Sequence, residues 1–105
     1  MTKRYPLEDC PVARTLNVIG ERWTLLMLRD LLLHGARRFQ DFQDSLVGVA
    51  PNTLSARLKS MEDNGLVERV VYSDRPPRLA YVLTEKGRSL GPIVKAMRDW
   101  GSKHD

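Results

Sequence analysis

The stretch FQDFQDSLVGVAPNTLSARLKSMEDNG, residues 39–65, predicts two helices joined by a short turn. Apolar side chains recur at helical spacing in both halves, at Phe39, Phe42 and Leu46 and then at Leu54, Leu58 and Met61. Gly48 suits a tight turn between them, Pro51 can open the second helix, and Gly65 can end it. This pattern is typical of a helix-turn-helix, although a plain hairpin of two helices shares it.

The residues that follow Gly65 change to the composition of β-strands. Residues 66–72 (LVERVVY) and 79–83 (LAYVL) are rich in β-branched and aromatic side chains, and residues 73–78 (SDRPPR) predict a turn. A β-hairpin directly after a helix-turn-helix is the arrangement of a winged helix. The proline pair stiffens the turn, which lowers the entropy cost of holding Arg75 in a groove. We therefore favour a winged helix over the helical hairpin.

The segment WTLLMLRDLLL, residues 23–33, is the most apolar of the chain and predicts a central buried helix. It is too short to span a membrane. Trp23 at its start is interpreted as a core residue rather than a residue that stacks on a ligand. Before this segment, Pro11 can open a helix. After the wing, Thr84 can cap a last helix that bends near Pro92.

We predict a single α+β, mainly α domain over residues 1–105. The helix-turn-helix covers about residues 38–65, the wing about 66–84, and a C-terminal helix about 85–101. The apolar face of the C-terminal helix exceeds what one small domain can cover. We therefore expect a homodimer in which this surplus at the end of the chain, Ile93, Val94, Met97 and Trp100, forms the interface.

Composition restricts the class of function. A net charge of +4 favours a polyanionic partner, although many cytosolic proteins are mildly basic. One cysteine and two histidines make no intrachain disulfide and no metal cluster, so we expect no metal and no cofactor. An enzyme with Cys10 as nucleophile is not expected, because neither His34 nor His104 lies in the arrangement of a catalytic base. Without a membrane-length apolar run or a signal-peptide pattern, the expected location is cytoplasmic, away from membranes.

The second helix of the helix-turn-helix carries short polar side chains opposite its apolar stripe, as a DNA recognition helix does. Asn52 and Ser55 suit base edges, whereas Arg57 and Lys59 suit phosphates. Two alternatives stay open, in which Arg57 forms a salt bridge with the acidic pair at 62–63 and Asn52 contacts no base. The full predicted set for double-stranded DNA is Arg37, Arg38, Asn52, Thr53, Ser55, Ala56, Arg57, Lys59, Ser60, Arg75 and Arg78.

Two parts of this set lie outside the second helix. Arg37 and Arg38 precede the helix-turn-helix and are predicted to contact phosphate, with a solvated charge pair as the alternative. Arg75 at the wing tip suits a narrow minor groove, whose negative potential favours an inserted arginine. Because a dimer places two recognition helices about one helical turn apart, the operator is expected to be a pseudo-palindrome.

Three stretches of the chain resemble the HxlR-type regulators, a branch of the MarR-like winged-helix group. They are CPVARTLNVIGERWTLLMLRDLLLHGARRFQDF (10–42), APNTLSARLKSMEDNGLVERVVYSDRPPRLAYVLTEKGRSL (50–90) and IVKAMRDWG (93–101). The resemblance implies a homodimeric bacterial transcription regulator that dimerises through its terminal helices, which adds Val12 and Leu16 of the N-terminal helix to the expected interface. The family usually has Ser or Thr where this chain has Ala50, so a side-chain cap worth roughly 1 kcal/mol is missing here.

The resemblance also implies a role for Cys10, because some members of the family sense electrophiles or oxidants through a cysteine at the matching position. A helix N-terminus favours the thiolate form, and Arg14 adds positive charge one turn later. A small structural cysteine that starts the helix is the alternative. Two further alternatives concern the whole chain: a winged-helix module that binds protein instead of DNA, and a regulator that responds to a small apolar ligand.

Overall fold

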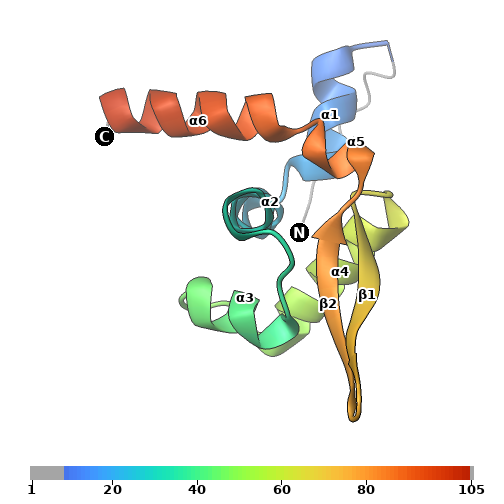
Figure 1. Ribbon diagram of the computed structural model, residues 1–105. Helices are drawn as coiled ribbons and strands as arrows, with labels where there is room; N and C mark the ends of the chain where they lie inside the picture. Colours follow the sequence, from blue (N-terminus) through green and yellow to red (C-terminus); the bar gives the residue numbers. More distant parts are fainter. Residues whose placement is uncertain (1–8, 105) are drawn as a thin grey trace.

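The computed structural model describes residues 9–104, which form one mainly helical α+β domain (Figure 1). Residues 1–8 and 105 of the predicted domain lie outside the described residues. Within residues 9–104, six helices and one antiparallel pair of strands follow each other in the order α1 (Pro11–Ile19), α2 (Arg22–His34), α3 (Phe39–Ser45), α4 (Pro51–Asp63), β1 (Val67–Asp74), β2 (Pro77–Leu83), α5 (Glu85–Arg88) and α6 (Gly91–Lys103). The predicted winged-helix architecture is confirmed.

The helix-turn-helix consists of α3 and α4, and its predicted apolar stripes form the core. The exposed fraction is 0% for Phe42 and Leu54, and 2% for Leu58. Gly48 has a φ of +92° in the turn and Gly65 a φ of +73° after α4, a backbone region that favours glycine. The turn and the end of α4 therefore lie where the sequence predicted them.

Helix α2 is the centre of the domain. Met27 and Leu28 are fully buried, and α2 contacts α1, α3, α4, β2 and α6. Trp23 is partly buried against this core, and the Arg22 guanidinium lies 4.7 Å from the centre of its ring. This position agrees with the core role predicted for Trp23. No helix within residues 9–104 has the length and apolarity to cross a membrane.

The wing is the hairpin of β1 and β2, and its strands reach closer to the tip than predicted. Cα pairing runs from Val67 opposite Leu83 to Asp74 opposite Pro77, with a bulge between Val71 and Ser73. The turn is therefore residues 75–76 rather than 73–78. Both faces of the ribbon near the tip are open to water, so polar residues can form strand pairs there. Composition alone therefore predicted strands that are too short at the tip.

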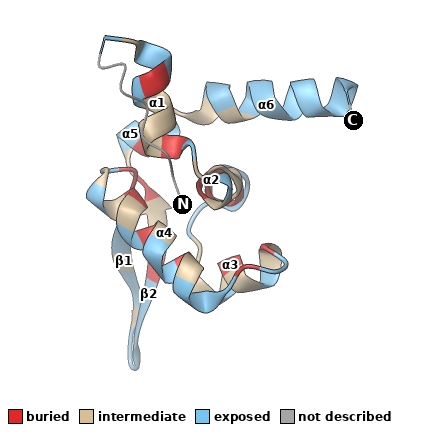
Figure 2. Cartoon of the chain, turned by 180° about the vertical axis from the view of Figure 1, so that it is seen from behind, coloured by how far each residue is buried: buried red, intermediate tan, exposed pale blue. Residues whose placement is uncertain are grey.

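The predicted C-terminal helix over about 85–101 is divided into α5 and α6 by Ser89 and Leu90. Pro92 occupies the first turn of α6, where its missing N–H costs no hydrogen bond, so the bend expected near this proline is a helix start. Helix α5 lies against the domain, and Thr84 caps it by accepting a 3.0 Å hydrogen bond from the Gly87 amide. Helix α6 has no buried residue and extends away from the body (Figures 1 and 2).

Candidate nucleic-acid interface

Helix α4 presents a polar face on the side opposite its buried stripe. Asn52, Ser55, Ala56 and Lys59 are exposed, because the core contacts of α4 run through Leu54, Leu58 and Met61. The remaining predicted contacts on α4 are partly exposed, namely Thr53, Arg57 and Ser60. The structure therefore brings all seven α4 residues of the predicted DNA-binding set onto its accessible surface.

Two ion pairs near the end of α4 show which residues pair with the carboxylates proposed as partners of Arg57. Glu62 accepts a 3.1 Å hydrogen bond from Arg69 of β1, and Asp63 lies 3.7 Å from the Lys59 ammonium. Within residues 9–104, neither carboxylate forms an ion pair with Arg57. The side chains of Lys59 and Asp63 are 78% and 65% exposed, so their pair contributes little and leaves the ammonium accessible to a phosphate.

The wing tip adds two further cations. Arg75 lies in the turn and Arg78 in β2, and both are exposed. In Figure 1 the tip, α3 and α4 occupy one end of the molecule, and α6 lies at the opposite end. Helix α4 and the wing tip therefore both lie away from α6.

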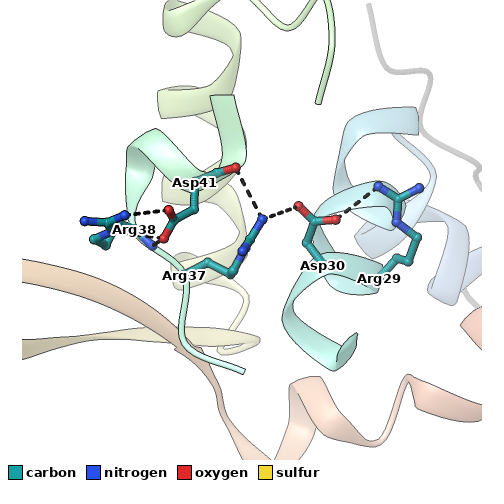
Figure 3. A network of polar contacts seen from close by, with 5 residues as sticks. All are labelled: Arg29, Asp30, Arg37, Arg38 and Asp41. Carbon is teal, nitrogen blue, oxygen red and sulfur yellow. Dashed lines mark hydrogen bonds and ion pairs between the residues drawn. The ribbon is translucent and has the colours of Figure 1, made fainter. Parts of the chain in front are cut away.

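Arg37 occupies a different environment from the one predicted. Its side chain is only 19% exposed. Its Nη2 donates to Asp30 Oδ2 at 3.5 Å and to the Asp41 carbonyl at 3.4 Å (Figure 3). The predicted phosphate contact of Arg37 is therefore corrected to an internal structural role, because the buried Asp30 of α2 supplies its counter-charge.

Arg38 is half exposed but is held by Asp41 of α3. Arg38 donates to the Asp41 carboxylate from Nη2 at 2.8 Å and from Nε at 3.1 Å, and its backbone N–H donates at 2.9 Å. The side-chain hydrogen bond from Arg38 lowers the pKa of Asp41 to about 2. Asp41 and, to a smaller extent, Tyr72 raise the pKa of Arg38. A phosphate would have to compete with Asp41 for this guanidinium, and the solvated charge pair is not realised.

Cys10 precedes α1 and is a partly exposed free thiol. Its carbonyl oxygen accepts a 3.0 Å hydrogen bond from the Arg14 amide, which is the first hydrogen bond of the helix. Its side chain accepts no hydrogen bond from an amide of α1. Among the described residues no cluster of His, Cys, Asp and Glu could hold a metal ion.

The surface predicted for dimerisation is at the end of the molecule that carries α1 and α6. Val12 is 67% exposed, Ile93 38%, Met97 50% and Trp100 66%, whereas Leu16 and Val94 are partly buried. A groove of about 480 Å³ between α2 and α6 is lined by apolar side chains and three cations: Leu25, Leu26, Arg29, Leu32, Leu33, Val94, Lys95, Met97 and Arg98, with Gly91.

The chain is a winged-helix protein of the HxlR-like helix-turn-helix family, whose sequence profile matches residues 18–105. It is 38% identical over 97 residues to the HTH-type transcriptional regulator YdeP of Bacillus subtilis, covering 92% of this chain and 75% of YdeP. It is 39% identical over 101 residues to the regulator YybR of the same organism, covering 95% of this chain and 80% of YybR.

Solved structures of two regulators have the same fold. The redox regulator HypR in its oxidized form superposes with a TM-score of 0.85 at 38% identity, over 91% of this chain and 98% of HypR. The reduced form of the transcriptional regulator YodB from B. subtilis gives a TM-score of 0.76 at 31% identity, over 90% of this chain and 93% of YodB. Family and fold together identify this chain as a DNA-binding transcriptional regulator and not an enzyme.

Proposed function

We propose that the protein acts as a homodimer that places α4 in the major groove and the wing tip in the adjacent minor groove of a pseudo-palindromic operator. The observation that carries this proposal is the joint exposure of the polar face of α4 and of Arg75 and Arg78, at the end of the molecule away from α6 (Figure 1). A recognition helix and a basic wing in this arrangement match the two grooves of duplex DNA.

The contacts divide by chemistry. Asn52 and Ser55 near the N-terminus of α4 suit base edges, and Lys59 and Arg57 further along suit phosphates. Arg75 suits the narrow minor groove of an A·T-rich flank. The remaining members of the proposed set are Thr53, Ala56, Ser60 and Arg78.

The proposed dimer forms through α6 and α1. Ile93, Met97 and Trp100 follow each other at spacings of four and three, so they lie on one side of α6, and all three are exposed. An apolar stripe of this kind is normally covered by a partner. A second copy is the partner we propose, because a twofold dimer would present two α4 helices to the two half-sites of a palindrome.

The experiment measures affinity for a duplex that the parent protein selects from a random library. Arg75→Ala is expected to weaken binding at least about fivefold, which corresponds to about 1 kcal/mol for a specific contact. Lys103→Ala is the matched control, because it removes an exposed cation at the far end of α6. Equal effects of the two variants would contradict a contact of the wing tip with DNA.

The proposed signal is oxidation of Cys10. Its support is the partly exposed thiol beside α1, together with the similarity to HypR, which is a redox regulator. In a dimer, two Cys10 thiols would give up two protons and two electrons to a peroxide and form an intersubunit disulfide, with water as the reduced product. The DNA affinity of Cys10→Ser should stay constant on addition of peroxide while that of the parent changes. A response of Cys10→Ser equal to that of the parent would exclude this thiol as the sensor.

The groove between α2 and α6 supports a second candidate signal, a small apolar ligand. Its volume of about 480 Å³ lies in the usual range of small-molecule sites, and most of its lining is aliphatic. The probe is anilinonaphthalene sulfonate, whose fluorescence should rise with the parent and not with Val94→Asp. Equal fluorescence with both proteins would place the dye elsewhere and remove this candidate.

A further inference from the structure

Arg37 connects three parts of the domain that are separate in the sequence. Its backbone forms both hydrogen bonds of a β-bridge with Tyr81 of β2, at 3.0 Å from its N–H and 2.7 Å to its carbonyl. Its guanidinium donates to Asp30 on α2 and to the Asp41 carbonyl on α3 (Figure 3). The base of the wing is therefore fastened to the central helix and to the helix-turn-helix through one residue.

Asp30 is the buried anchor of this connection. The residue is 1% exposed, yet it carries a carboxylate among the buried side chains of α2. Its Oδ1 accepts a 3.0 Å hydrogen bond from Arg29 and its Oδ2 accepts from Arg37. The Arg29 side chain is 43% exposed, whereas that of Arg37 is 19% exposed, so Arg37 is the partner that depends on Asp30.

The hydrogen bonds of the Arg37 guanidinium add little to stability, but they can fix the position of β2. Its contacts to Asp30 and Asp41 are long, at 3.5 and 3.4 Å, and its Nε is buried without a hydrogen-bond partner among the described residues. Buried ion pairs of this quality are often no more stabilising than apolar residues of the same volume. What the pair supplies instead is a direction, because the guanidinium reaches α2 and α3 while the backbone of the same residue is hydrogen-bonded to β2.

We infer that Asp30 is a positioning residue for the wing, which it orients toward DNA through Arg37. The inference rests on the proposed contact of Arg75 with the minor groove. Arg75 lies six positions before Tyr81, so the tip lies about 20 Å beyond the bridge at about 3.3 Å per residue. A rotation of about 10° at the bridge would move the tip by about 3.5 Å, which is more than the length of a hydrogen bond.

The test is a double-mutant cycle for DNA affinity, which separates wing placement from overall stability. In the parent background, Arg75→Ala should weaken binding to the selected duplex at least about fivefold. In the Asp30→Asn background, the same change should cost less than about twofold, because a displaced tip has no contact left to lose. Lys59→Ala on α4 should cost the same in both backgrounds, since α4 does not depend on Arg37 for its packing.

Two further variants separate the loss of wing position from unfolding and from a general effect of charge. Asp30→Leu combined with Arg37→Met keeps the volume without a buried charge, so this double variant should fold even where Asp30→Asn does not. It should reduce the cost of Arg75→Ala in the same way. Arg29→Met removes the exposed partner of the same carboxylate and should leave the Arg75 effect unchanged.

Hydrogen exchange gives a reading without DNA. The Tyr81 amide, which donates to the Arg37 carbonyl, should exchange at least about tenfold faster in Asp30→Asn, while amides inside α4 keep their protection. Unchanged Tyr81 exchange, or a full cost of Arg75→Ala in the folded Asp30 variants, would overturn the inference. If Arg75→Ala does not weaken DNA binding in the parent background, the proposed wing contact is refuted, whatever the exchange rate of the Tyr81 amide.

Discussion

Replacing Trp100 by alanine tests whether α6 forms the dimer interface. Trp100 is 66% exposed, and a tryptophan side chain buries up to about 150–250 Å² when fully covered, so a partner would cover about 100–165 Å². At about 25 cal/mol per Å², this area contributes about 2.5–4 kcal/mol per protomer. The contribution counts twice in a symmetric dimer. Part of this free energy offsets the entropy cost of ordering side chains at the interface. Trp100→Ala should still raise the dimer dissociation constant at least about a hundredfold.

Sedimentation equilibrium over a range of protein concentrations measures this constant directly. Val47→Ala is the matched control, because Val47 is 89% exposed in the turn before α4 and lies outside the proposed interface. It should change the dissociation constant less than about twofold, in line with the small effects of most surface substitutions. A Trp100→Ala protein that dimerises as tightly as the parent, or a parent that stays monomeric, would refute the assignment of α6 as the interface.

Three further predictions concern stability. Gly87→Ala should lower the free energy of unfolding by about 1–3 kcal/mol in a urea titration, because the added Cβ would clash with the Leu66 carbonyl oxygen, which cannot move alone. Ala50→Ser should raise it by about 0.5–1 kcal/mol in the same assay, because Ala50 precedes α4 and makes no side-chain cap. Asp41 should contribute stability above about pH 4 that is lost as the pH falls toward about 2, since its pKa in the folded state is lowered to about 2 from 3.8. A melting-temperature series from pH 5 to about 2 should show this loss in the parent and a smaller one in Asp41→Asn.

The sequence was sufficient for the elements whose formation depends on local pattern. Helical spacing of apolar residues located α3 and α4, and Pro51 and Gly65 marked the ends of α4 within one or two residues. The change to β-branched residues after Gly65 located the wing. The exposed face of α4 also followed from spacing, because the buried stripe of a helix determines its opposite side.

The roles of Arg37 and Arg38 did not follow from the sequence, because their partners are determined by tertiary packing. Asp30 lies seven residues before Arg37, as the one carboxylate in the apolar stretch 23–33, and nothing in that spacing pairs the two. Only the packing of α2 against β2 and α3 brings this carboxylate to Arg37. Asp41 three residues after Arg38 was the one available signal, since an acidic residue in the first turn of a helix often caps it.

The most direct test of the central claim is the salt dependence of binding between the reduced parent protein and its selected duplex, measured by fluorescence anisotropy. The account predicts preference for that duplex over random DNA and an affinity that falls linearly on logarithmic axes, with a slope of about −0.9 for each phosphate neutralised. It also predicts that Lys59→Ala makes this slope shallower by about one. A salt-independent affinity, or no preference over random DNA, would contradict operator recognition through α4 and the wing and would favour a winged-helix module that binds protein.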